Sequence, residues 1–286
     1  MTGRRRDDAV AMIALHARRS RAAIESWKAA RPGRALVVAL TGTDLYRDFP
    51  AGDAEVRRSL DDADRLIVLQ SDALRFLPEL WRDKADVVYQ SARALVPFRR
   101  KATESLHCLL VAHLREEKDP RSVFAAWREL PRDIPARLSI IGAALDPALG
   151  DAAHALAAED PRVQVLGPRP HAWTRQAIKR AHLLIVSSRM EGGANVVVEA
   201  VTAGTPVVAS RMSGNLGMLG EDYPGYFEVG DGHGLAKLVE HAHRDVAFVD
   251  ALRSACARRA ALFTPEAERA ALAAAVERAI KHATVE

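Results

Sequence analysis

The chain has 286 residues, of which 49% are hydrophobic and 27% are charged, so it is long enough for two globular domains and too apolar to be disordered. Its 41 Lys and Arg nearly balance its 37 Asp and Glu and are scattered along the chain, which argues against nucleic-acid binding and leaves small anions as candidate ligands. No apolar run approaches the ~20 residues that cross a bilayer, and the two cysteines form neither a disulfide framework nor a metal motif, so we expect a cytoplasmic protein without membrane insertion or metal.

The first third of the chain shows short apolar runs separated by helical or loop-like stretches. Arg4 begins a basic run ahead of an apolar stretch, but Asp7 and Asp8 interrupt it, so we do not expect a secretion signal. The stretch AVAMIALHARRS, residues 9–20, is typical of a strand and the turn that follows it. Further buried strands are predicted at 35–40, 65–69 and 86–89.

The charged segment 96–105 lacks apolar periodicity and is predicted to link two domains. Helix starts are then marked by a capping residue before a proline, at Asp119, Asp146 and Thr264. The second series of strands is predicted at 106–114, 137–142, 163–167, 182–188 and 206–210. Such alternation of strands and helices indicates parallel α/β sheets. We predict an N-terminal domain at 1–98, a C-terminal domain at 104–264 and a C-terminal helix at 265–286.

The stretch SSRMEGGANVVVEAVTAG, residues 187–204, combines a loop with an apolar helix that carries a glutamate in its middle. The two glycines, Gly192 and Gly193, would let backbone N–H groups approach a ligand closely, and the N-terminus of a helix attracts anions such as phosphate. Glu199 lacks a cation nearby in the sequence and could instead accept hydrogen bonds from the hydroxyls of a ribose, while Glu191 could bind a sugar ring. The alternatives are an exposed helix charge and an ordinary turn.

Glu191 and Glu199 form an E-x7-E arrangement followed by EAVTAGTPVVAS, and this pattern resembles the donor site of GT4-type retaining glycosyltransferases. Enzymes of that group have the GT-B fold, in which two Rossmann-like domains face a cleft, and the resemblance implies that the C-terminal helix at 265–286 packs back on the N-terminal domain. A second motif of the group, Gly-Arg-Leu-x-x-x-Lys-Gly, corresponds here to AHLREEKD, residues 112–119. Lys118 matches the motif lysine, His113 stands at the arginine position, and Arg115 could supply the missing charge. Solvated loop charges are the alternative for Lys118 and Arg115.

The resemblance implies roles for two sets of residues. The catalytic set is Glu191, Lys118 and Arg115. The donor-binding set is His113, Gly192, Gly193, Ala194, Asn195, Val196, Glu199 and Arg169.

Four segments, at 13–20, 40–48, 188–197 and 214–231, resemble a narrower branch of the same group, the selenosugar synthases of selenoneine biosynthesis. Members of that branch join selenophosphate to the sugar of UDP-N-acetylglucosamine and release UDP. This resemblance implies UDP-sugar and selenophosphate as substrates, with no cofactor. Because selenium is itself nucleophilic, no general base would be needed.

An anionic acceptor needs cations opposite the donor, and arginine binds phosphate-like anions with two hydrogen bonds. Any single arginine could equally be a surface charge, and Asp44 could equally be a turn or cap residue. The acceptor-binding set is His16, Arg18, Arg19, Thr41, Gly42, Asp44, Arg47 and Arg93.

The chain starts at what resembles a later strand of the group's first domain, so we expect the N-terminal domain to be incomplete, lacking the opening βα segments. Two other functions stay open: a nucleotide-sugar transferase with a hydroxyl acceptor, and a non-catalytic nucleotide-sugar-binding protein. An NAD-binding protein is not expected, because no G-x-G-x-x-G follows a strand. The oligomeric state is left open.

Overall fold

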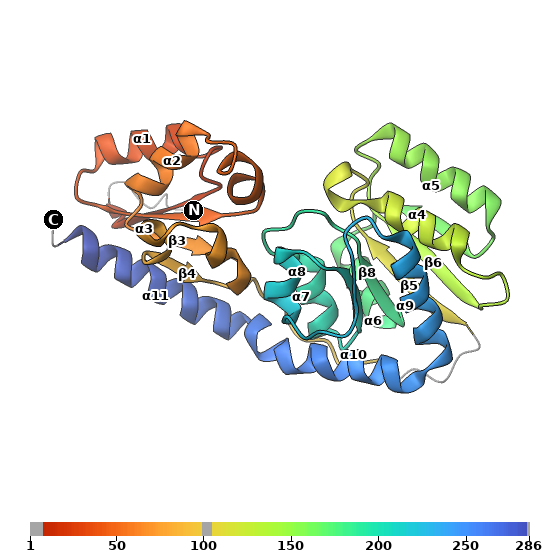
Figure 1. Ribbon diagram of the computed structural model, residues 1–286. Coiled ribbons are helices and arrows are strands. Elements are labelled where there is room, and N and C mark those ends of the chain that lie inside the picture. The colour runs from red at the N-terminus through yellow and green to blue at the C-terminus, as the bar shows by residue number, and fades with distance from the viewer. Residues whose placement is uncertain (1–7, 99–104, 285–286) are drawn as a thin grey trace. The chain divides into compact units, whose positions relative to one another are not determined.

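The computed structural model describes residues 8–98 and 105–284. The chain divides into two compact units, one formed by Met1–Gln90 with Glu266–Glu286 and the other by Ser91–Pro265. Each unit is a parallel β-sheet with helices packed against it (Figure 1). No helix within the described ranges is both long and apolar enough to traverse a bilayer.

The first unit has a four-stranded parallel sheet in the order β1-β2-β3-β4. Helices α1 and α2 cover one face of it through Ile24, Val56 and Leu60, and helix α11 covers the other through Ala275 and Ala279, which are fully buried. Its strands and helices are β1 (Ala11–Leu15), α1 (Arg21–Ala30), β2 (Ala35–Leu40), α2 (Ala54–Asp62), β3 (Arg65–Val68), α3 (Glu79–Arg82), β4 (Ala85–Val87) and α11 (Pro265–Ala283), with a π-helical turn at Asp44–Asp48 and a 3-10 turn at Ser71–Phe76.

Helix α11 joins the first unit although it comes last in the chain. Ala275 and Ala279 lie four residues apart, so they occupy the same face of the helix, and their small side chains allow close approach to the sheet. Arg278 adds a hydrogen bond of 2.7 Å from its Nη2 to Oδ1 of Asp86 in β4, and Arg65 in β3 holds the same carboxylate with two bonds of 2.9 Å.

The second unit has a six-stranded parallel sheet in the order β10-β9-β8-β5-β6-β7. Strands β8 and β9 are buried along their whole length, as expected for parallel strands covered on both faces. Its elements are β5 (Leu106–Val111), α4 (Pro120–Glu129), β6 (Ala136–Ile141), α5 (Pro147–Glu159), β7 (Val163–Gly167), α6 (His171–Arg180), β8 (Leu183–Val186), α7 (Asn195–Thr202), β9 (Val207–Ser210), α8 (Ser213–Leu219), β10 (Tyr226–Phe227), α9 (Gly232–Arg244) and α10 (Val246–Arg259), with 3-10 turns at Glu116–Lys118 and Ala260–Phe263.

These sheets confirm the predicted α/β class, and two details differ from the sequence prediction. The strand expected at 106–114 ends at Val111, and only an isolated bridge between Leu114 and Ala144 continues the pairing. Residues 91–98, predicted to end the N-terminal domain, group with the second unit, because the backbone N–H of Leu95 donates to the carbonyl of Thr202. Most of the predicted linker, residues 99–104, lies outside the described residues.

Candidate functional site

A cavity of about 490 Å³ lies in the second unit, where the sheet meets the start of α7. Strands β5, β6 and β7 each end at it, and the loop after β8 closes it, so the cavity occupies the carboxyl edge of the sheet, where ligands of open α/β sheets bind. Its lining residues are Val111, Ala112, His113, Lys118, Ile141, Gly142, Pro168, Arg169, Thr174, Glu191, Gly193, Ala194, Asn195 and Val196.

Lys118 and Glu191 meet at this cavity although 73 residues separate them. Nζ of Lys118 donates to Oε1 of Glu191, and Oγ of Ser188 donates to the same oxygen at 2.7 Å. Two further hydrogen bonds join the two loops: the side-chain Oγ of Ser187 donates to the carbonyl of Lys118 at 2.7 Å, and the backbone N–H of Arg189 donates to the carbonyl of Glu117 at 2.9 Å. The cation and the carboxylate are therefore held in a fixed geometry.

Asp119 follows Lys118 at the position where the transferase motif has glycine, and it adopts the left-handed conformation that glycine favours, with φ of 43°. Its side chain is buried and caps no backbone N–H of α4, so the predicted capping role is wrong for this residue. Its Oδ2 instead accepts from Oγ of Ser122 at 2.7 Å and pairs with Nε of Arg189 at 3.3 Å. Asp119 thus stabilises the turn that presents Lys118. Asp146, by contrast, caps α5 as predicted, accepting from the N–H of Ala148 at 2.9 Å.

His113 lines the cavity in place of the motif arginine. Its Nδ1 accepts from the N–H of Ala143 at 3.0 Å, so the proton of the neutral imidazole lies on Nε2, which is left as a donor. Arg115 does not line the cavity; its Nε lies 3.9 Å from Oε2 of Glu117 and half of its side chain is exposed. The suggestion that Arg115 supplies the missing charge is therefore wrong for this geometry, because the strand that would have placed it beside His113 has already ended at Val111.

Helix α7 begins at Asn195 with Ala194 as its N-cap, and the residues of its first turn, Asn195 and Val196, line the cavity, so that its free N–H groups are available there. Gly193 and Val196 line the same space, whereas Gly192 is buried behind them.

Glu199 lies one turn beyond the cavity lining on the partly exposed stripe of α7 that also carries Asn195 and Val196. The apolar helix therefore has a partly exposed stripe, and Glu199 has a polar partner that is distant in the sequence. Oε1 of Glu199 lies 2.6 Å from Nε2 of His171, at the start of α6, and 15% of its side chain is exposed.

Several residues of this site were not found in the sequence. Gly142 has φ of +147°, and a Cβ built on it would lie 1.9 Å from the carbonyl oxygen of Ala112, so only glycine permits this approach of β5 and β6. Gly214 in α8 is similarly close to the backbone of Glu191. The sequence signal that could have identified Gly142 is an apolar run that ends in glycine.

Arg169, predicted to bind the donor, lines the cavity with its guanidinium 5.6 Å from the ring centroid of Trp173.

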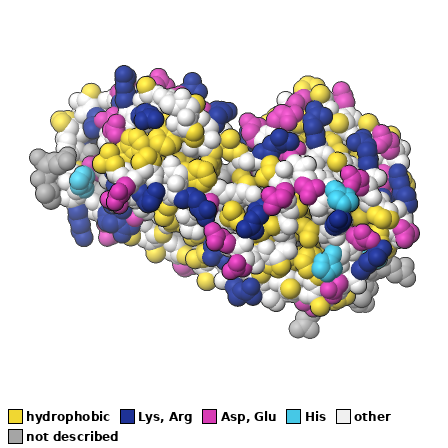
Figure 2. All heavy atoms as spheres, viewed as in Figure 1, with side chains coloured by type: hydrophobic (Ala, Val, Ile, Leu, Met, Phe, Trp, Pro, Cys, Tyr) yellow, Lys and Arg dark blue, Asp and Glu magenta, His cyan; other side chains and the backbone are white. Residues whose placement is uncertain are grey.

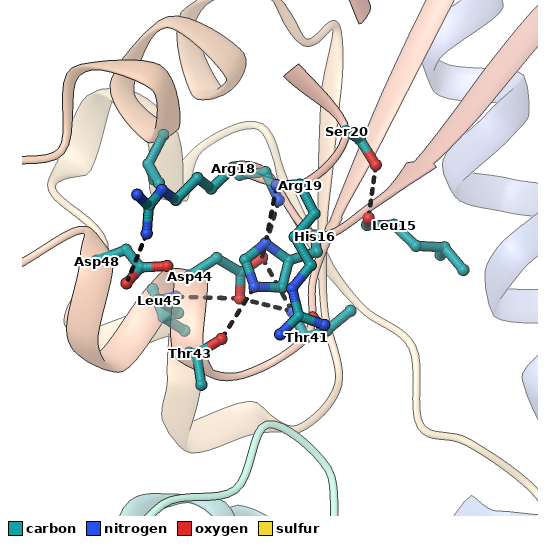
Figure 3. Close-up of polar contacts among 12 residues, drawn as sticks. Leu15, His16, Arg18, Arg19, Ser20, Thr41, Thr43, Asp44, Leu45 and Asp48 are labelled. Carbon is teal, nitrogen blue, oxygen red and sulfur yellow. Dashed lines mark hydrogen bonds and ion pairs between the residues drawn. The ribbon is translucent and has the colours of Figure 1, made fainter. Parts of the chain in front are cut away.

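The first unit holds a separate polar cluster at the carboxyl ends of β1 and β2, drawn in Figure 3. Asp44 has no exposed surface, and its carboxylate accepts four backbone N–H bonds, from Ala17, Thr41, Gly42 and Leu45. Because a carboxylate so enclosed cannot reach an acceptor, the acceptor-binding prediction is wrong for Asp44. The alternative, a residue that orders the loop, explains these contacts, and the N–H groups of Thr41 and Gly42 are engaged in the same way.

His16 completes this cluster in a left-handed conformation, with φ of 72°. Its Nε2 lies 2.9 Å from Oγ1 of Thr43, and its Nδ1 accepts from the N–H of Arg19 at 3.3 Å, so both ring nitrogens are engaged and the side chain is buried (Figure 3). The histidine therefore supports the turn between β1 and α1.

The predicted acceptor arginines are exposed, and two of them are paired with carboxylates. Arg18 and Arg47 both contact Asp48, at 4.0 and 2.9 Å, and Arg18 also pairs with Asp53. Arg19 is exposed next to His16, and Arg93 belongs to the second unit. On the face drawn in Figure 2, basic and acidic side chains are interspersed over both units.

A comparison with known protein families finds a match in the second unit. The family described as "Glycosyl transferases group 1" matches residues 97–263, which include every residue that lines the cavity. A Xenopus tropicalis protein named glycosyltransferase 1 domain-containing protein 1 is 31% identical over 110 residues, which make up 37% of this chain and 31% of that protein. The chain thus spans about a third of this relative's length.

Similar solved structures cover both units. Anabaena HepE, crystallised with UDP and glucose, matches with a TM-score of 0.76 and 18% identity over 94% of this chain and 77% of its own. A sucrose-phosphate synthase from Thermosynechococcus elongatus matches with a TM-score of 0.77 and 18% identity over 94% and 73% of the two chains. These likenesses confirm the predicted GT-B type fold. Since the family match extends over more than half of the sequence, the chain belongs to the glycosyl transferases of group 1.

Proposed function

We propose that this protein is a cytoplasmic glycosyltransferase that takes a sugar from UDP-N-acetylglucosamine, joins it to selenophosphate and releases UDP. The part of the proposal that concerns the sugar donor rests on the cavity at the carboxyl edge of the second sheet. There Lys118, His113 and the N-terminus of α7 present hydrogen-bond donors to one space. Solved relatives of the same fold, such as Anabaena HepE, were crystallised with UDP. The acceptor half rests on the sequence resemblance to selenosugar synthases.

In the proposed reaction the selenium atom attacks the anomeric carbon, the bond from that carbon to the β-phosphate oxygen breaks, and UDP leaves with the electron pair. Negative charge develops on the diphosphate, so donors fixed before the reaction stabilise the transition state more than the ground state. Lys118 supplies the full charge, the Nε2–H of His113 and the N–H groups at Ala194 and Asn195 supply hydrogen bonds, and Glu191 orients the sugar.

Arg19 is the strongest candidate for the anionic acceptor among the predicted arginines of the first unit. It is exposed at the carboxyl end of β1, whereas Arg18 and Arg47 are already engaged by Asp48. A guanidinium can give a selenophosphate oxygen two parallel hydrogen bonds.

The test is an anaerobic incubation with UDP-N-acetylglucosamine, with and without selenophosphate, followed by mass spectrometry for UDP and for a selenium isotope pattern on the sugar. We expect a selenosugar only when selenophosphate is present, and loss of product in Lys118→Met and Arg19→Gln. The control is His233→Gln, which alters an exposed histidine paired with Glu129 at 2.9 Å between α9 and α4.

Two outcomes would contradict the proposal in different ways. UDP release that depends on a hydroxyl compound and not on selenophosphate would identify a transferase with another acceptor. UDP binding by titration calorimetry without turnover of any donor would identify a nucleotide-sugar-binding protein.

A further inference from the structure

The contact between His171 and Glu199 joins the start of α6 to the middle of α7, beside the cavity. Nε2 of His171 in α6 lies 2.6 Å from Oε1 of Glu199 in α7, although 28 residues separate them. The side chain of His171 is 77% exposed and that of Glu199 only 15%, so an exposed histidine contacts a largely buried carboxylate from the solvent side. The structure gives no partner to Oε2 of Glu199 among the described residues.

Both partners lie one helical turn from the cavity. Thr174 lines it three residues after His171, and Val196 lines it three residues before Glu199, so each pair shares one face of its helix. Arg175 fixes the helix backbone at this level, since its Nη1 donates to the carbonyl of Glu199 at 3.4 Å and to Oγ1 of Thr202 at 3.3 Å. The contact between His171 and Glu199 therefore lies one helical turn from the cavity lining, on a helix backbone that Arg175 holds in place.

We infer that His171 is a specificity-determining positioning residue, which holds Oε1 of Glu199 so that Oε2 accepts hydrogen bonds from the ribose hydroxyls of a nucleoside diphosphate. This inference rests on the proposed function, because it requires such a nucleotide in the cavity. The site then selects ribonucleotides over nucleotides that lack the two hydroxyls.

The physical reason is the rotamer freedom of glutamate. A free glutamate on a helix populates several side-chain conformations, and fixing one of them on ligand binding costs free energy that is subtracted from the affinity. His171 fixes the carboxylate beforehand, and it does so as a donor whether its ring is neutral with the proton on Nε2 or protonated. His171 therefore contributes to the affinity only of ligands that donate a hydrogen bond to the carboxylate of Glu199.

The experiment is a titration-calorimetry cycle with two probes, UDP and 2′,3′-dideoxy-UDP, on the full chain. His171→Leu removes the donor and should weaken UDP binding about three- to tenfold, the worth of one hydrogen bond, while changing binding of the dideoxy probe less than about twofold. His171→Gln keeps an N–H donor at a similar reach and should retain the affinity for UDP. Because the side chain is exposed, neither change should unfold the chain.

His233 provides the matched control, since it makes a similar exposed contact with Glu129 away from the cavity. His233→Gln should leave the affinity for both probes unchanged.

Four results would overturn the inference. Equal weakening of both probes in His171→Leu would indicate a general structural role, and no weakening of either would indicate a surface contact without function. Equal affinity of the unaltered protein for the two probes would show that no group recognises the ribose hydroxyls, while leaving the proposed donor intact. If the unaltered protein binds neither probe, the proposed function fails and this inference fails with it.

Discussion

Replacing Gly142 by alanine tests the most sterically constrained point of the cavity. The residue follows β6 with φ of +147°, a backbone conformation that side chains rarely permit. A Cβ there would lie 1.9 Å from the carbonyl oxygen of Ala112, 2.5 Å from its carbonyl carbon and 2.9 Å from the backbone nitrogen of His113. All three atoms belong to the backbone just beyond β5, which pairs with β6 and β8, so they cannot move aside without disturbing the sheet.

The expected cost has two parts. The unusual backbone conformation contributes about 1–3 kcal/mol, and the overpacking contributes about 1–3 kcal/mol more. Together they reduce the free energy of unfolding by about 2–6 kcal/mol, a large share of the ~5–15 kcal/mol that is typical of a folded domain. Gly167→Ala is the matched control, because Gly167 also has a positive φ, of 68°, but nothing lies within 4 Å of its Cβ position. Only the backbone cost, about 1–2 kcal/mol, is expected there.

Hydrogen exchange of peptides from β5 and β6, measured by mass spectrometry across a urea series, reports this cost without interference from the first unit. Titration of UDP checks the site itself, because a shifted Ala112 carbonyl moves the cavity wall next to His113. The reasoning is refuted if Gly142→Ala is as stable as Gly167→Ala and binds UDP equally well.

Three further predictions follow from single side chains. Lys118→Ala should lower kcat/KM for transfer by about 10²–10³-fold, whereas Arg115→Ala, outside the cavity, should change it less than about threefold in the same steady-state assay. Asp119→Ala should be less stable than Asp119→Gly in urea denaturation by about 1–2 kcal/mol, because only glycine adopts φ of 43° without cost; equal stabilities would contradict this. Burial acts to raise the pKa of Asp160, but hydrogen bonds from Arg162 outweigh it and hold this pKa below its ordinary value. The contribution of Asp160 is therefore present at neutral pH and is lost as the pH falls through the folded-state pKa, so Asp160→Asn should be destabilised at pH 7 and approach the unaltered protein below about pH 4.

The sheets could be predicted from the sequence because parallel strands buried on both faces appear as short continuous apolar runs. The runs at 35–40 and 163–167 coincide with β2 and β7, and the others agree to within a few residues. The main error, at 106–114, arose because Ala112 and Leu114 extend the apolar run beyond Val111, where the strand ends. The chain leaves the sheet there to bring Ala112 against Gly142, and such a close approach depends on a residue 30 positions away.

The candidate site was predictable where its residues lie within one loop and helix, as from Glu191 to Val196. It was not predictable where it depends on contacts across the fold. Nothing in the sequence near Glu199 indicates His171, and nothing near Lys118 indicates that Ser187 and Arg189 hold its loop. These contacts arise because parallel strands bring distant loops to one edge of a sheet, a consequence of topology rather than of local pattern.

Burial separates the acidic residues that build the loops from those that can meet a ligand. Asp44 and Asp119 are both almost wholly buried. Backbone N–H groups donate to both oxygens of Asp44, whereas Oδ2 of Asp119 contacts Ser122 and Arg189 and its Oδ1 is buried without a partner. Carboxylates so enclosed act on the fold itself, by fixing the shape of the loops that surround them.

Glu191 and Glu199 differ in keeping 11% and 15% of their side chains exposed at or beside the cavity, each with one oxygen engaged. A carboxylate with one oxygen held by the protein and the other free has a defined orientation and can still accept a further hydrogen bond. On this criterion the two glutamates of the E-x7-E pattern keep an oxygen that can accept a hydrogen bond, as the proposed donor site requires, and the two buried aspartates form the support on which Lys118 and the loop after β2 are positioned.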